Sequence, residues 1–122
     1  MRQTPLRSLT RRRDFDFVFK DGVSAATKSL VVYARPNELN FSRLGLSVSK
    51  KIGKAVTRNR VKRLLREAMR KMSGDIPLHY DFVLVARKLS ADSGLDDFML
   101  DIKRLLSRLI REKNPDIAHK NI

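Results

Sequence analysis

Cysteine is absent from this 122-residue sequence, and its acidic residues are outnumbered by basic ones. Without cysteine there is neither a disulfide framework nor a thiolate zinc site. The two histidines, His79 and His119, are far apart and have no metal-ligand spacing around them. No stretch approaches the ~18 consecutive apolar residues of a membrane-spanning helix, and the first residues lack the apolar segment of a secretory signal. We therefore expect a cytoplasmic protein that holds no metal or other cofactor of its own.

Internal repeats, low-complexity tracts and linkers rich in proline or glycine are also missing. The apolar content of 42% suits one domain with a single modest core. We predict one domain over residues 1–122, with flexible ends at 1–9 and 113–122.

The charge is strongly positive, with 27 Lys and Arg against 13 Asp and Glu and a net charge of +14. Ten basic residues and a single acid, Glu67, lie between Lys50 and Lys71, whereas residues 90–122 hold six of each sign. A basic surface attracts polyanions, which means nucleic acid or an anionic membrane. The uneven distribution predicts one binding face.

The first element predicted by the apolar pattern is a short helix. It begins at about Thr10, buries Phe15, Val18 and Phe19 on one face, and stops at Gly22.

Longer elements follow, and they indicate an α+β fold of one sheet against helices. The predicted strands span residues 30–34, 43–49 and 81–86. Amphipathic helices are predicted at 57–72, capped by Thr57, and at 95–111, capped by Ser93. The stretch 22–34 leaves room for a further strand that the pattern does not resolve.

The predicted helix at 57–72 is apolar on one side and basic on the other, since successive residues turn by about 100°. Arg58 and Arg60 flank the boundary between the two sides. Guanidinium groups hold phosphates by paired hydrogen bonds, and Asn59 can bond to sugar or base edges. A basic helix face is often only a solvated surface, but this run is long, nearly free of acids and joined to a basic loop. It favours a nucleic-acid contact.

No group of residues indicates catalysis by the protein. Gly53-Lys54 lacks the Gly-x-x-x-x-Gly-Lys-Ser/Thr spacing of a phosphate-binding loop. Asp14 and Asp16 would point in different directions on a helix, which argues against a metal site. No nucleophile, base and orienting group stand together. We expect no catalytic residue.

The stretch KKIGKAVTRNRVKRLLRE, residues 50–67, resembles the signature of the bacterial ribonuclease P protein family. The motif consists of Arg58-Asn59-Arg60 followed by Lys62-Arg63 and Arg66-Glu67. Weaker matches include Asp14-Phe15, Val18-Phe19, Gly22, residues 43–49 and Ala86-Arg87-Lys88. The resemblance covers roughly residues 6 to 110.

This resemblance implies a two-layer sandwich in the order helix, three strands, helix, strand, helix. It also implies a left-handed strand–helix–strand crossover, against the usual rule. The implied function is that of the protein subunit of ribonuclease P, a ribonucleoprotein endonuclease. The subunit binds the catalytic RNA and the 5′ leader of precursor tRNA and aids removal of the leader during tRNA 5′ maturation. The RNA, with Mg²⁺ bound through it, is the catalyst.

Two sets of site residues follow from the resemblance. Contacts with the catalytic RNA are expected from Lys50, Lys51, Lys54, Arg58, Asn59, Arg60, Lys62, Arg63 and Arg66. The leader is expected in a cleft between the first helix and the sheet, lined by Phe15, Phe19 and Tyr33. Single-stranded RNA is held by stacking on aromatic rings beside positive charge. Phe15 and Phe19 can instead fill the core, while the hydroxyl of Tyr33 favours a wet edge.

Two other classes of function fit the composition. A general RNA-binding or ribosomal protein would use the same basic face without preferring one RNA. A membrane-surface protein would use a basic amphipathic helix, but here the apolar side of the helix is needed for the core. Preference for one RNA therefore discriminates between the two RNA-binding hypotheses.

Overall fold

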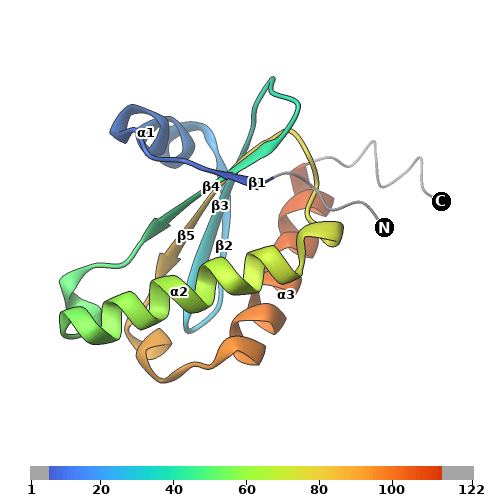
Figure 1. Cartoon of the computed structure of the whole chain (residues 1–122). Coiled ribbons are helices and arrows are strands. Elements are labelled where there is room, and N and C mark those ends of the chain that lie inside the picture. The colour runs from blue at the N-terminus through green and yellow to red at the C-terminus, as the bar shows by residue number, and fades with distance from the viewer. Residues whose placement is uncertain (1–5, 114–122) are drawn as a thin grey trace.

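A computed structural model describes residues 6–113 of the chain, with side chains up to residue 110 (Figure 1). In this range the chain forms three α-helices, five strands and three short 3-10 segments. They are β1 (Leu6–Ser8), α1 (Arg12–Asp21), β2 (Val23–Ala26), β3 (Leu30–Pro36), β4 (Ser42–Ser47), η1 (Lys50–Ile52), α2 (Ala55–Lys71), η2 (Ser73–Asp75), β5 (Tyr80–Ala86), η3 (Lys88–Asp92) and α3 (Leu95–Lys113). The predicted α+β class is confirmed.

The five strands form one mixed sheet in the order β1-β4-β5-β3-β2. β5 is central, antiparallel to β3 and parallel to β4. Helix α2 therefore connects two parallel neighbours, β4 and β5, as a crossover. β1 pairs in parallel with the outer side of β4, over residues 42–44 only. That short pairing leaves the rest of the β4 edge without a neighbouring strand.

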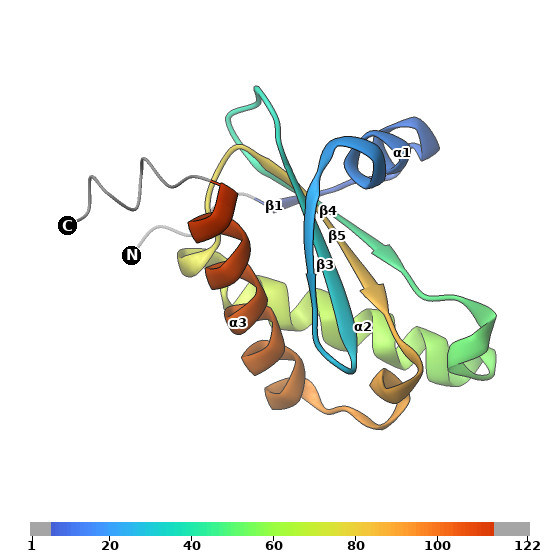
Figure 2. The same cartoon turned by 180° about the vertical axis from the view of Figure 1, so that it is seen from behind.

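Alternation along the strands divides the apolar residues between two faces of the sheet. Phe82 and Leu84 of β5 lie in the main core with residues of α2 and α3. Val83, between them, packs on the opposite face with Val18 of α1 and with Leu9. Helices α2 and α3 thus cover one face, and α1 covers part of the other (Figures 1 and 2). The predicted two layers, a sheet and the helices packed on it, are present, and α1 adds a partial third layer on the other face of the sheet.

Both predicted helix caps are wrong, although both helices are present. Helix α2 begins two residues before Thr57 and follows Lys54, with no side-chain cap. Helix α3 follows Gly94, whose backbone N–H donates to the Asp97 carboxylate at 2.9 Å. Ser93 instead ends η3. The Asp97 carboxylate in the first turn thus caps the start of α3, a role that the sequence pattern assigned to Ser93.

Two strands were not resolved by the pattern. β2 fills the stretch before β3 and is joined to it by a tight turn, in which the Thr27 hydroxyl accepts the N–H groups of Ser29 and Leu30. β1 lies within the N-terminal stretch that we expected to be flexible, and Leu9 after it is only 4% exposed. Residues 1–5 and 114–122, the remainder of the expected flexible ends, lie outside the described residues.

Candidate nucleic-acid interface

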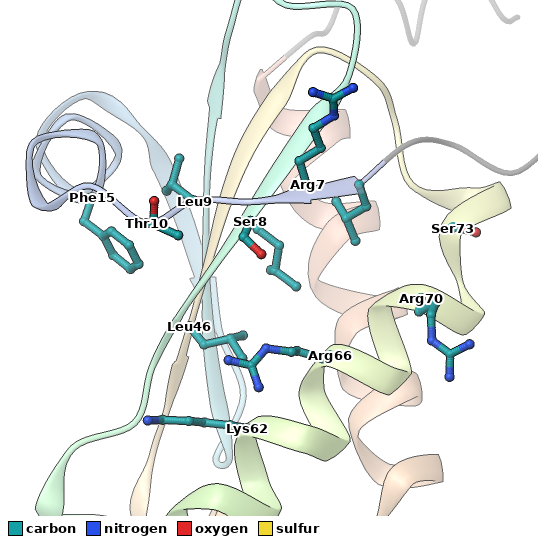
Figure 3. Close-up of a pocket in the computed structure, with 12 residues that line it drawn as sticks. Arg7, Ser8, Leu9, Thr10, Phe15, Leu46, Lys62, Arg66, Arg70 and Ser73 are labelled. Atoms are coloured by element: carbon teal, nitrogen blue, oxygen red, sulfur yellow. The ribbon is translucent and has the colours of Figure 1, made fainter.

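A cleft of about 710 Å³ opens along the uncovered edge of β4, between the end of β1, the start of α1 and one flank of α2 (Figure 3). Its lining residues are Leu6, Arg7, Ser8, Leu9, Thr10, Phe15, Leu44, Leu46, Lys62, Arg66, Arg70 and Ser73. None of them is acidic. The cleft exists because β1 stops pairing at Leu44, where its last contact is a hydrogen bond from Leu9 N to Leu44 O of 2.8 Å.

The basic side of the cleft comes from α2. Lys62, Arg66 and Arg70 are four residues apart, so they lie on one flank of the helix in successive turns. Figure 3 shows Lys62 and Arg66 extending from α2 toward β4. We name these three side chains the cleft cations. Arg7 lines the opposite side, and its guanidinium lies 4.3 Å from the centre of the Phe41 ring, which is cation–π distance.

An aromatic row continues from the cleft across the sheet. Ring centres of Phe15 and Phe19 are 6.4 Å apart, and those of Phe19 and Tyr33 are 4.9 Å apart in an edge-to-face arrangement. Phe19 is 41% exposed, whereas Phe15 and Tyr33 are half-buried. The structure thus brings together the three residues that the resemblance placed at the leader.

Phe15 belongs to the smaller core and is also accessible from the cleft. In that core it packs beside Leu9, Val18 and Val83. Its ring fits over β4 because residue 45 is glycine, since a Cβ there would lie 2.5 Å from the Phe15 Cζ.

Two arginines of the predicted RNA-binding set are engaged within the fold. Arg58 Nη1 donates to Gly53 O at 2.8 Å. Arg60 donates to Ala91 O at 2.9 Å and to Ser93 O at 3.0 Å, so it fastens α2 to η3. Their half-buried positions confirm that both flank the boundary of the helix face. The structure does not place Arg60 beside the cleft cations.

The other predicted RNA-binding residues form a more open surface. Lys50 and Lys51 belong to η1, and Lys54 directly precedes α2, all three being exposed. Asn59 and Arg63, one turn apart on α2, are exposed as well.

The charged network around Arg43 was missed by sequence reasoning. Arg43 donates to both carboxylate oxygens of the buried Asp81, at 2.8 and 2.7 Å, and Asn37 donates to the same carboxylate at 2.8 Å. A longer contact of 3.5 Å joins Arg43 to Asp14 of α1. The hydrogen bond to Asp81 raises the pKa of Arg43 by more than burial lowers it, and the charges of Asp81 and Asp14 add to the rise. Through Asp14 the network links α1 to strands β4 and β5.

The part of the chain that the structure describes contains no candidate metal site and no candidate membrane-spanning helix. In this part of the chain no three His, Asp or Glu side chains converge as metal ligands. No helix in it is long and apolar enough to cross a bilayer.

The fold is of α+β class, and a cleft that joins cationic and aromatic side chains in a chain of high positive charge is typical of RNA-binding proteins. The model of the family described as ribonuclease P matches residues 4–110. The chain belongs to the ribonuclease P protein family, and as a protein component of ribonuclease P it has a role in tRNA processing.

Relatives and solved structures agree with this assignment. The chain is 46% identical over 103 residues to the ribonuclease P protein component of Clostridioides difficile, covering 84% of this chain and 90% of the relative. It is 41% identical over 106 residues to that of Streptococcus pneumoniae, covering 85% and 86%.

Among structures, the ribonuclease P protein of Staphylococcus aureus superimposes with a TM-score of 0.75 and 35% identity, covering 82% of this chain and 92% of that one. The Thermotoga maritima protein gives 0.74 and 36%, covering 86% and 96%.

Proposed function

We propose that this chain binds both the catalytic RNA of ribonuclease P and the 5′ leader of precursor tRNA, and so helps the RNA to remove the leader. The observation that carries the proposal is the cleft, in which Lys62 and Arg66 face Phe15 across the uncovered edge of β4. Membership in the family supports it independently.

The cleft suits a single RNA strand better than a duplex. A single strand offers phosphates and unstacked bases together, so it gains from cations and aromatic rings in one groove. The cleft cations supply the charge, and Phe15 supplies ring surface within the cleft. Phe19 and Tyr33 do not line the cleft but extend the row of rings beyond it. Each phosphate neutralised also releases counterions, which makes binding depend on salt.

The catalytic RNA has a separate surface in this proposal, which gives Lys62 and Arg66 to the leader although the resemblance assigned them to the catalytic RNA. Exposed Lys50, Lys51 and Lys54 lie at the start of α2, and Asn59 and Arg63 continue along its outer side. A structured RNA presents phosphates over a broad area, and these five exposed side chains are spread from η1 to Arg63 of α2. The two RNAs can then be bound together.

Catalysis is assigned to the RNA. None of the described residues that line the cleft is acidic, and the carboxylates of Asp81 and Asp14 are paired with Arg43. Mg²⁺ is therefore proposed to be held through the RNA, while the protein lowers the repulsion between phosphates that extra Mg²⁺ would otherwise screen. We assign this work to the cytoplasm, where precursor tRNA is made in bacteria such as the relatives' sources.

The test is reconstitution with the cognate catalytic RNA and a precursor tRNA at low Mg²⁺. The chain should raise the rate of leader removal, and this gain should shrink as Mg²⁺ increases. The chain without RNA should cut nothing. Site-specific cleavage by RNA-free protein would overturn the proposal, and so would equal affinity for the catalytic RNA and for an unrelated structured RNA of the same length. The latter result would favour a general RNA-binding protein.

A further inference from the structure

A second hollow lies at the end of the sheet where the β2–β3 turn meets the end of β5. It encloses about 530 Å³. Its lining residues are Ala26, Thr27, Lys28, Arg87, Lys88 and Leu89. The β2–β3 turn lies beside the end of β5 because Leu30, at the start of β3, pairs with Ala86, at the end of β5. Three of the six lining residues are basic and none is acidic. None lines the β4 cleft or belongs to the motif at residues 50–67, although Arg87 and Lys88 are part of a weaker match to the family.

Arg87 is held in place before any ligand arrives. Its backbone N–H donates to Ser29 O at 2.8 Å, and its Nη1 donates to Thr27 O at 3.0 Å. A guanidinium carries five N–H donors, so one hydrogen bond orients the group and leaves others for an anion. The turn itself is tied by the Thr27 hydroxyl. An oriented guanidinium loses less conformational entropy on binding than a free one.

Lys28 and Lys88 surround this guanidinium with exposed charge. No ion pair among the described side chains involves Lys28, Arg87 or Lys88. Asp92, at the end of η3, is the acid closest in sequence, and it does not line the hollow.

Leu89 adds an apolar surface to the hollow. Its side chain is 55% exposed and lies beside the three cations. Phosphate groups next to a ribose or base offer the matching combination of anionic and apolar surface.

The hollow is separate from the cleft proposed for the leader and adjoins the segments proposed for the catalytic RNA. It shares no lining residue with the β4 cleft. Segment η1, which carries Lys50 and Lys51, packs against η3, which carries Lys88 and Leu89. Figures 1 and 2 both place the β2–β3 turn at the same end of the molecule as the start of α2.

We infer that the hollow formed by Lys28, Arg87 and Lys88 is a second phosphate-binding site for the catalytic RNA, continuous with the lysines of η1. This inference rests on the proposed function and extends it. Two strands of a folded RNA would then be held at once, one along α2 and one across the end of the sheet.

The test is the salt dependence of catalytic-RNA binding by Lys28→Ala/Lys88→Ala. Both lysines are exposed, so the fold should persist. The slope of log affinity against log salt should become shallower by about one unit per lost contact. Lys103→Ala/Arg104→Ala, which removes two exposed charges from α3, is the matched control and should leave the slope nearly unchanged. Equal slopes for the two double variants would overturn the inference.

Failure of the inference can be separated from failure of the proposed function. Lys62→Ala/Arg66→Ala should weaken binding of long-leader precursor tRNA to the holoenzyme. If this loss is seen while the Lys28/Lys88 variant behaves as the control, the second site is wrong and the proposed function stands. If the wild-type chain shows no preference for the catalytic RNA, both are wrong.

A direct map is available because the chain has no cysteine. An iron chelate tethered to Lys28→Cys would have a single attachment point and would cleave nearby RNA. Cuts in the catalytic RNA are expected. Cuts confined to the leader would contradict the assignment.

Discussion

Helix α2 has two regions of similar composition whose basic side chains are used differently. In its first turns, Arg58 and Arg60 donate to backbone carbonyls of Gly53, Ala91 and Ser93. Further along, Lys62, Arg66 and Arg70 line an open cleft. Together with Arg43, the first two form a set that we name the anchored arginines, in contrast to the cleft cations.

The two regions of α2 differ because different segments of the chain lie beside them. Arg60 meets η3, a segment about thirty residues later in the chain, whereas Lys62 and Arg66 meet the edge of β4 that β1 leaves uncovered. A hydrogen bond from a charged group to a buried acceptor contributes about 1.5–3 kcal/mol, while an exposed cation contributes little to folding. Replacing an anchored arginine should therefore lower the free energy of unfolding, and replacing a cleft cation should weaken RNA binding.

Arg43→Ala should have the largest effect. It leaves the carboxylate of Asp81, which is 2% exposed, without its charged partner. Removing one member of a buried pair costs about 3–5 kcal/mol of unfolding free energy, and the partial exposure of Arg43 favours the lower end. The melting temperature should fall by on the order of 10 °C.

The control for this variant is Arg63→Ala, an exposed arginine on α2. Its melting temperature should stay near that of the wild type. Equal melting temperatures for the two variants would show that the Arg43 network contributes nothing.

Arg60→Ala should have an intermediate effect, because it removes the two hydrogen bonds that fasten α2 to η3. We expect a loss of about 1–3 kcal/mol in denaturant unfolding. The salt slope of RNA binding should stay nearly constant, since the guanidinium already serves the fold. A slope reduced by a full unit at unchanged stability would instead support the RNA contact that the resemblance assigns to Arg60.

Much of the fold was predictable because its signals are local. The apolar spacing of Val61, Leu65, Ala68 and Met69 sets the buried face of α2, and all four are fully buried. β1 was not predictable, since three residues carry no period and the strand exists only through its pairing with β4.

The site was predictable in part. The aromatic row came from the family resemblance, and its geometry agrees. The roles of Arg58 and Arg60 could not be separated from those of Lys62 and Arg66, because a helical pattern shows which side a residue faces and not which loop packs there. Arg7 and the pair of Arg43 with Asp81 depend on contacts between distant segments. The sequence pattern around each residue does not indicate such long-range contacts.

The dependence of precursor-tRNA binding on leader length tests whether the cleft and the aromatic row hold the leader. The holoenzyme would be titrated with substrates carrying a one-nucleotide or a long leader, using wild type, Tyr33→Ala and Lys62→Ala/Arg66→Ala, with melting curves as folding controls. Stacking on one base contributes about 1–3 kcal/mol, so Tyr33→Ala should weaken long-leader binding about tenfold. In the double variant, binding of the long-leader substrate should also depend less steeply on salt. Substrates with a one-nucleotide leader should bind to both variants as they do to the wild type. Equal losses for both leader lengths in correctly folded variants would contradict the assignment of the cleft to the leader.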